Sequence, residues 1–211
     1  MSEDASAGTA PADGEQRVAD DRWLGSAPVI DEPLPGDVQA TIEEFMGMES
    51  AETLRDWIDE YRRITGGASV DFEDLCHAEE ETAHWGEMDG ETYYFACFYD
   101  ALLMAEMRGS ATEIHTESPE GTVIEAEATG EGDLAVTPEE TVVSFGISTE
   151  VGPSPDGPKI AEVYGAVCPY VKAFPDREEY ERWADGVPAA TVAMPLMEAV
   201  DLAGKFVSDP E

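Results

Sequence analysis

Four segments in the second half of the chain alternate apolar and polar residues, and this pattern constrains the fold more than any other feature. They span residues 112–118, 122–129, 141–149 and 162–168, and glycine, proline and acidic residues separate them. A period of two is typical of strands that bury one face. Short connections between such strands favour antiparallel pairing. The pattern therefore predicts a mainly antiparallel sheet.

The region before these segments has a helical period instead. Asp37 can cap a helix that runs to Met46, and Ser50 is the expected N-cap of a second helix that two glycines end. The apolar residues of this second helix recur at positions i, i+3, i+4 and i+7, which places them on one face. They are Leu54, Trp57, Ile58 and Tyr61.

Together these patterns predict an α+β protein. We expect a small N-terminal helical unit over residues 36–88, followed by a mainly antiparallel sheet domain with flanking helices over residues 89–211. Residues 1–35 are rich in alanine, glycine, proline and acidic residues and show no period, so we expect a disordered acidic tail there.

Net charge restricts the possible partners. The chain has 48 acidic and 11 basic Lys and Arg residues, a formal charge of −37, and the acids run from Glu3 to Glu211. Such a surface repels nucleic-acid phosphates and anionic membranes, so we expect neither as a partner. Evenly spread acids with only three lysines are typical of cytoplasmic proteins of salt-accumulating halophiles, where salt screens the repulsion.

The three cysteines are Cys76, Cys97 and Cys168, and none is part of a CxxC motif. No apolar stretch reaches the length of a membrane span, and the N-terminal residues lack the basic and apolar regions of a secretory signal. We therefore expect a cytoplasmic protein in which the cysteines are free thiols.

Cys97 and Asp100 lie three residues apart, where an expected strand (91–97) runs into an expected helix. Side chains at this spacing face the same way on a helix. A thiol near a helix N-terminus is favoured as thiolate, and a carboxylate one turn along can exchange a proton with it. The alternative is a small buried cysteine beside an acid that suits the helix dipole.

Cys168 ends the last alternating segment and precedes Pro169. Two thiolates and a carboxylate, from Cys97, Cys168 and Asp100, would suit a soft, thiophilic metal. The alternative for Cys168 is a buried residue at a strand end. For Cys76, His77 and His84 a structural role is favoured, because no second pair of ligands completes a zinc site.

Three segments resemble the alkylmercury lyase (organomercurial lyase) family. They are YYFACFYDALLMAEMRGSATEIHTES (93–118), YGAVCPYVKAFPDREEYERWA (164–184) and VPAATVAMPLMEAVDLAGKF (187–206). The first carries the Cys-x-x-Asp motif and the second carries the second cysteine. The chain departs from the family pattern at Thr116 and Pro169, where members have cysteine.

The resemblance implies protonolysis of a carbon–mercury bond to Hg(II) and a hydrocarbon. Cys97 and Cys168 are then the mercury ligands, and Asp100, which could also contact mercury, is the proton shuttle. No cofactor is expected, because mercury is substrate and product. The implied partners are an organomercurial, low-molecular-weight thiols and a mercuric reductase that receives Hg(II).

A second hypothesis keeps the same thiols without the reaction. In it the chain is a non-catalytic protein that binds or delivers Cu(I) or Hg(II). Asp100 discriminates between the two hypotheses, because a carrier needs no acid beside its thiols.

Overall fold

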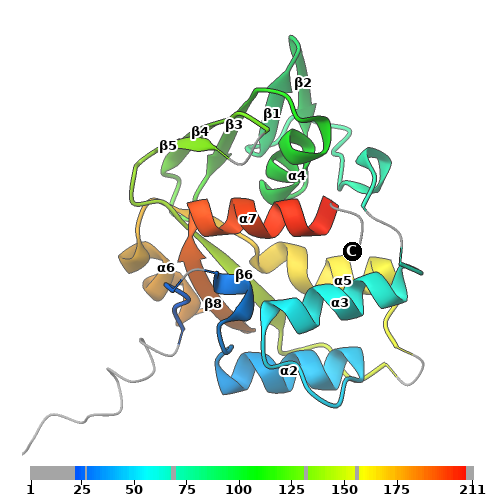
Figure 1. The fold of residues 1–211 in the computed structure, drawn as a ribbon. Helices are drawn as coiled ribbons and strands as arrows, with labels where there is room; N and C mark the ends of the chain where they lie inside the picture. Colours follow the sequence, from blue (N-terminus) through cyan, green and yellow to red (C-terminus); the bar gives the residue numbers. More distant parts are fainter. Residues whose placement is uncertain (1–21, 27, 68–69, 131–132, 155–156, 208–211) are drawn as a thin grey trace, which may run out of the picture.

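The computed structural model describes residues 22–26, 28–67, 70–130, 133–154 and 157–207. Two antiparallel sheets and several helices make up an α+β fold, as predicted (Figure 1). The helices are α2 (Gly36–Met46), α3 (Leu54–Ile64), α4 (Tyr99–Arg108), α5 (Ile160–Val167), α6 (Arg177–Ala184) and α7 (Leu196–Val207), with short 3₁₀ turns η1 (Val29–Asp31), η2 (Phe72–Asp74) and η3 (Cys168–Tyr170).

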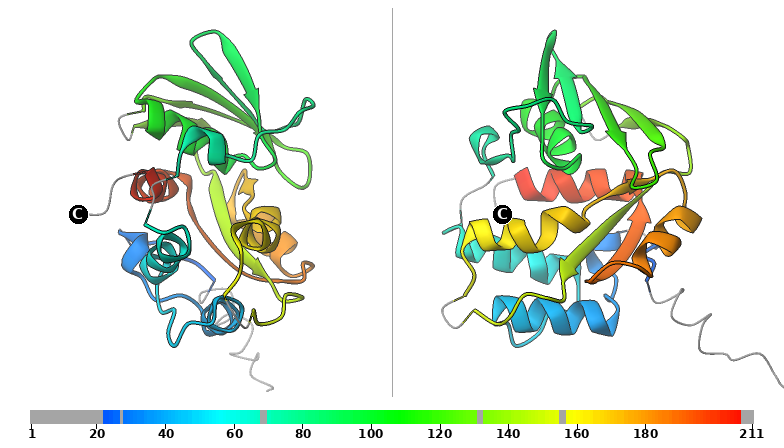
Figure 2. Two further views of the ribbon diagram at one scale, coloured as in Figure 1. Left: turned by 90° about the vertical axis from the view of Figure 1, so that its right-hand side faces the viewer. Right: turned by 180° about the vertical axis from the view of Figure 1, so that it is seen from behind.

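The larger sheet has the strand order β2-β1-β3-β4-β5, and the smaller has the order β7-β6-β8. The strands are β1 (Trp85–Met88), β2 (Glu91–Tyr94), β3 (Thr112–Glu117), β4 (Val123–Ala128), β5 (Leu134–Thr137), β6 (Val142–Ser148), β7 (Ala173–Phe174) and β8 (Ala189–Pro195). Helix α7 packs against α4 and lies between the larger sheet and helix α3 (Figure 2).

The N-terminal helices share their core with the smaller sheet. Val38 and Ile42 of α2 belong to the same buried cluster as Phe145 and Ile147 of β6. The rings of Trp57 and Phe145 also meet edge to face at 5.5 Å. The expected boundary between residues 88 and 89 falls in the turn that joins β1 to β2, and β1 pairs with both β2 and β3.

The predicted disordered tail is too long. Residues 1–21 lie outside the described part of the chain, but residues 22–24 pair with β8. Leu24 donates a backbone hydrogen bond to Ala193 (2.8 Å), whose own N–H donates to Arg22 (3.0 Å). Leu24 and Val29 are buried. Burial of these apolar side chains stabilises a segment whose overall composition predicted disorder.

Residues 160–167 form helix α5, so the predicted strand ending at Cys168 is wrong. Val163, Ala166 and Val167 are the buried residues of this helix, and their spacing of i, i+3 and i+4 defines one helical face. The Glu162 carboxylate accepts a hydrogen bond of 2.7 Å from the Lys159 N–H, which stabilises the first turn. A short apolar run fits both periods, and tertiary packing decided between them.

Helix α3 begins later than predicted, with Thr53 rather than Ser50 as its N-cap. The Thr53 side chain accepts a hydrogen bond from the Asp56 N–H, and the Asp56 carboxylate accepts one from the Thr53 N–H. This reciprocal pair is a capping box.

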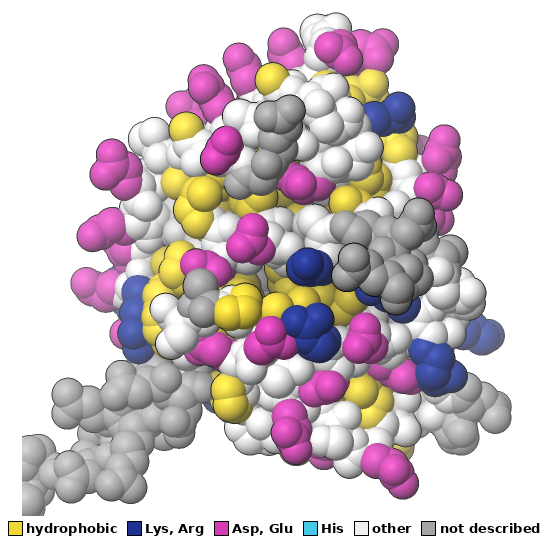
Figure 3. Space-filling model, viewed as in Figure 1, with side chains coloured by type: hydrophobic (Ala, Val, Ile, Leu, Met, Phe, Trp, Pro, Cys, Tyr) yellow, Lys and Arg dark blue, Asp and Glu magenta, His cyan; other side chains and the backbone are white. Residues whose placement is uncertain are grey.

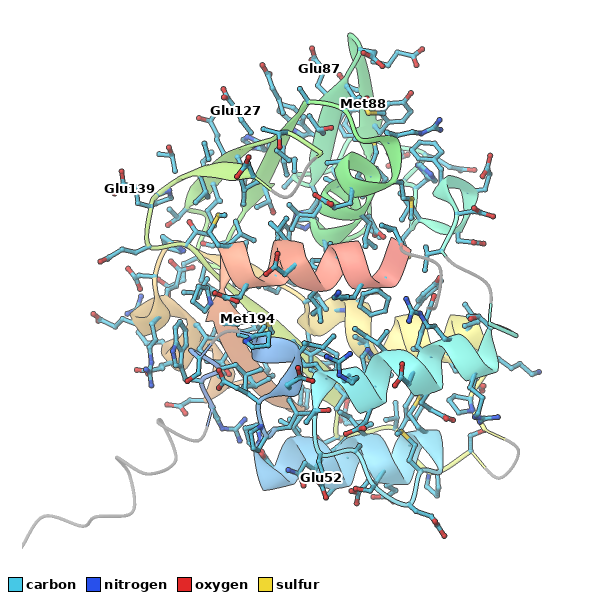
Figure 4. All side chains as sticks on the ribbon, viewed as in Figure 1. Glu52, Glu87, Met88, Glu127, Glu139 and Met194 are labelled. Atoms are coloured by element: carbon cyan, nitrogen blue, oxygen red, sulfur yellow. The ribbon has the colours of Figure 1, made fainter. Side chains whose placement is uncertain are left out.

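Acidic side chains are scattered over the surface seen in Figure 3. Figure 3 shows them spread over the whole visible face rather than gathered into one patch. Glu52, Glu87, Glu127 and Glu139 are exposed and point outward, whereas Met194 lies among the packed elements (Figure 4). None of the described helices has the length and apolar character needed to cross a bilayer.

Candidate active site

The start of helix α4 holds the predicted thiol and carboxyl together. Cys97 lies two residues before the helix and Asp100 lies in its first turn. Both are buried, with 4% and 7% of their surface exposed. The Cys97 thiol donates a hydrogen bond to Asp100 Oδ2 at a sulfur–oxygen distance of 3.3 Å. The spacing of three residues therefore brings them into direct contact.

The end of helix α5 brings Cys168 to the same place. Cys168 opens the turn η3, and the Cys168 thiol interacts with the Cys97 thiol. Strand β6 holds this turn, because Ser144 Oγ donates a hydrogen bond of 2.8 Å to the carbonyl of Tyr170. The structure thus gathers the three predicted site residues, and their chemical roles stay predictions.

A third thiol, that of Cys76, lies in this group. It interacts with the Cys168 thiol, and the Cys76 backbone hydrogen-bonds the Asp100 carboxyl. The segment around Cys76 pairs with the chain just before Cys97. Ala96 N–H donates to the Cys76 carbonyl at 2.8 Å, and His77 bridges to Phe95. This pairing brings Cys76 to the site, although the sequence favoured a structural role for it.

The neighbouring histidines point elsewhere. His77 Nε2 lies 2.8 Å from the carbonyl oxygen of Phe72, and His84 Nδ1 lies 2.6 Å from Thr116 Oγ1. Burial lowers the pKa of His84 to about 4, and the nearby charges of Lys172 and His115 act in the same direction. No histidine is among the described residues that line the cavity.

The thiols and Asp100 face a cavity of about 110 Å³ where α3, α4, α5, α7 and β6 meet. Apolar and aromatic side chains make up most of the wall: Trp57, Tyr61, Val70, Leu75, Tyr99, Leu103, Val143, Phe145, Val163, Tyr164, Val167, Val171, Met194, Ala199, Leu202 and Phe206. The hydroxyls of Tyr61 and Tyr164 are hydrogen-bonded at 3.0 Å, and Tyr99 donates to the carbonyl of Ala199 at 2.9 Å. Tyrosine polar atoms in the wall are thus paired, as buried polar groups generally are.

Burial changes the acidity of the carboxyl. It raises the pKa of Asp100 from 3.8 to about 6, against the smaller opposing effects of the Cys97 thiol, the Cys76 backbone and the His77 charge. An acid with this pKa holds a proton much closer to neutral pH than an ordinary aspartate does. It is therefore suited to donate that proton in a reaction.

The thiols of Cys76 and Cys168 affect each other. A hydrogen bond from Cys168 lowers the pKa of Cys76, while the interactions with Cys76, and then with Cys97, raise the pKa of Cys168. Of these two thiols, Cys76 therefore loses its proton first. The Cys168 thiol then donates a hydrogen bond to the Cys76 thiolate.

The cysteines are free thiols that interact with one another. Within the described ranges, no group of three or more His, Cys, Asp and Glu side chains is already arranged around a common point as metal ligands are. Binding a metal here would replace thiol–thiol interactions with sulfur–metal bonds.

The family described as MerB, alkylmercury lyase, matches residues 77–208, more than half of the chain. The chain belongs to the alkylmercury lyase family. The matched segment contains Cys97, Asp100 and Cys168 and begins one residue after Cys76.

Among solved structures, the chain is similar to the mercury-bound form of MerB2, with a TM-score of 0.47 and 18% sequence identity. The alignment covers 69% of this chain and 86% of that chain. No curated protein matches the chain.

Proposed function

We propose that this member of the alkylmercury lyase family is an organomercurial lyase that cleaves the carbon–mercury bond by protonolysis. The observation that carries the proposal is the hydrogen bond between Cys97 and the buried Asp100, beside the thiol of Cys168. This contact supplies a soft ligand and a proton donor at one place.

The first steps are capture and ligand exchange. A thiolate binds a soft alkylmercury cation far better than oxygen ligands do. Cys97 passes its thiol proton to the Asp100 carboxylate, to which it is already hydrogen-bonded, and its sulfur binds mercury. Cys168 adds a second sulfur and loses its proton to solvent or to a departing thiolate.

The second step breaks the carbon–mercury bond. Two thiolates push electron density onto mercury and through it onto the attached carbon. The Asp100 carboxyl donates its proton to this carbon, and the electron pair of the carbon–mercury bond forms the new carbon–hydrogen bond. The products are a hydrocarbon, Hg(II) on two sulfurs and the Asp100 carboxylate, and mercury stays in the +2 state throughout.

The apolar wall fits the organic part of such a substrate. Trp57, Phe145 and Leu103 line the cavity, and an alkyl or aryl group gains by leaving water for such surroundings. Excluding water also strengthens the electrostatic effect of the thiolates on the carbon.

Low-molecular-weight thiols are the proposed acceptors of Hg(II), with a mercuric reductase as a downstream partner. We also propose a cytoplasmic, high-salt setting, on the basis of the net charge of −37 and its even distribution.

The test is to incubate the protein with phenylmercury and excess thiol and to measure benzene by gas chromatography. Benzene in molar excess over protein supports the lyase. Tight binding of phenylmercury without any benzene would favour the alternative, a non-catalytic carrier of soft metals. The contact of Asp100 with the Cys97 thiol favours the lyase, because a carrier needs no buried proton donor there.

A further inference from the structure

We propose that Cys76 is a third sulfur ligand, which holds the Hg(II) product together with Cys97 and Cys168 after the hydrocarbon has left. This inference rests on the proposed function for the origin of the Hg(II). It assigns Cys76 to product retention, a step separate from carbon–mercury bond cleavage.

The first support is the position of the Cys76 side chain. It lines the same cavity as Cys97 and Cys168, and its thiol interacts with that of Cys168. Cys168 interacts with both other thiols, and all three cysteines line the same cavity. A metal held by Cys97 and Cys168 is therefore close to the sulfur of Cys76.

The second support is that the backbone fixes this position. The Cys76 carbonyl accepts a hydrogen bond from Ala96, the residue before Cys97, and Ala78 N–H donates to Tyr94 at 2.8 Å. The antiparallel bridge between His77 and Phe95 lies between these two bonds. Cys76 is thus paired with the segment that immediately precedes Cys97, and this pairing holds its backbone beside the site.

The third support is that the surroundings of Cys76 differ from those of a cysteine that only fills space. A cysteine that only fills space is surrounded by apolar groups. Cys76 instead is partly exposed to the cavity, contacts another thiol and holds the Asp100 carboxyl with its backbone. It also lies just outside the segment 77–208 that the family match covers, so this ligand is contributed by a part of the chain beyond that match.

The chemical step balances without an oxidant or reductant. After cleavage, Hg(II) carries two thiolate sulfurs and the Asp100 carboxylate has given up its proton. The sulfur–hydrogen bond of Cys76 breaks, its sulfur binds mercury, and the proton passes to the Asp100 carboxylate. The product is a three-sulfur mercury thiolate anion beside a protonated Asp100, which returns its proton to a cysteine sulfur when an external thiolate takes the mercury.

A three-sulfur site should hold the product until an external thiol removes it. Each incoming thiolate displaces one cysteine sulfur. With a third sulfur in the site, the protein rebinds the mercury faster than the mercury leaves. Release would therefore depend on the concentration and on the chelating power of the acceptor.

The experiment adds HgCl₂ directly to fully reduced protein, so that it does not depend on lyase activity. X-ray absorption at the mercury edge counts the bound sulfurs, and glutathione competition measures retention. We expect three sulfurs for the wild type and two for Cys76→Ser. We also expect Cys76→Ser to lose Hg(II) at roughly tenfold or more lower glutathione, since even partners outside the first ligand shell contribute 10–100-fold to metal affinity.

The matched control restores the number of thiols without restoring the site. The control combines Cys76→Ser with Ser26→Cys and therefore has three thiols again. Because Ser26 is exposed and far along the chain from the cavity residues, the new thiol does not replace Cys76 in the site. It should still show two sulfurs and weak retention. Cys76→Ala is a second variant that removes the same thiol. The sulfur count of the wild type tests the inference without any variant.

Two sulfurs in the wild type, or three sulfurs in Cys76→Ser, would overturn the inference. A parallel benzene assay on the wild type separates this failure from failure of the proposed function. Three sulfurs without benzene would leave Cys76 as a ligand in a carrier protein. Benzene with two sulfurs would leave a lyase whose third thiol takes no part.

Discussion

The Cys97 thiol and the Asp100 carboxylate are joined by a hydrogen bond of 3.3 Å in the first turn of α4, and both side chains are more than nine-tenths buried. Burial favours the protonated form of the acid, while the hydrogen bond keeps it against the sulfur. In the proposed reaction this pair would join mercury capture to proton donation.

Asp100→Asn should separate binding from cleavage. The amide keeps the size of the side chain but cannot donate an acidic proton, so Hg(II) binding should persist while hydrocarbon release falls by about 10²–10⁴-fold, the usual contribution of general acid catalysis. Single-turnover benzene release from phenylmercury measures this. The control is Asp74→Asn, an exposed acid at the rim of the same cavity, which should keep near wild-type rates. Equal losses in both variants would argue against a special role for Asp100.

Cys97→Ser and Cys168→Ser should each reduce benzene release to the background rate. Because both sulfurs must hold mercury at once, the double variant should be no slower than either single variant. Initial rates at saturating phenylmercury measure this. If the rate loss of the double variant equalled the product of the two single losses, the two thiols would act independently.

The pH dependence of stability should report the burial of Asp100. Its pKa rises from 3.8 to about 6 on folding, so between these pH values the folded state keeps a proton that the unfolded state has lost. Stability from this group is fully present below pH 3.8 and is lost as pH rises through about 6.

Asp100→Asn lacks this dependence, because the amide does not titrate. The free energy of unfolding of the wild type, relative to Asp100→Asn, should fall on the order of 2–3 kcal/mol between pH 4 and 7, at about 1.4 kcal/mol per unit of pKa shift. Urea unfolding of both proteins across this range measures the difference. A difference that is constant with pH would show that Asp100 is not buried as described.

Thermal stability should rise with salt. The Debye length shortens from about 10 Å at 0.1 M salt to about 3 Å at 1 M, which weakens the repulsion among the surface acids. The unfolding midpoint should increase by several degrees between 0.1 and 2 M KCl, since each kcal/mol shifts it about 2–4 °C in a chain of this size.

The matched variant replaces the exposed Glu52, Glu87, Glu127 and Glu139 with glutamine (Figure 4). It should be more stable at low salt and respond less to KCl. An unfolding midpoint that does not change with KCl would contradict the high-salt interpretation.

The sequence was sufficient for features set by local spacing. The i, i+3 relation predicted the contact between Cys97 and Asp100. The alternating segments at 112–117, 123–128 and 142–148 are strands β3, β4 and β6.

Features set by tertiary contacts were not predictable in the same way. Cys168 is carried by a helix, because burial of Val163 and Val167 against the core overrode the alternating reading. Cys76 reaches the site through backbone pairing with residues 94–96, and backbone hydrogen bonds leave no trace in the pattern of side chains.

Deuterium incorporation tests the central claim most directly. The protein is incubated with methylmercury and excess thiol in D₂O, and the headspace gas is analysed by mass spectrometry. Protonolysis by Cys97, Cys168 and Asp100 predicts singly deuterated methane in molar excess over protein, absent from Asp100→Asn over the same time. Methane without deuterium, or no methane at all while methylmercury stays bound, would contradict it.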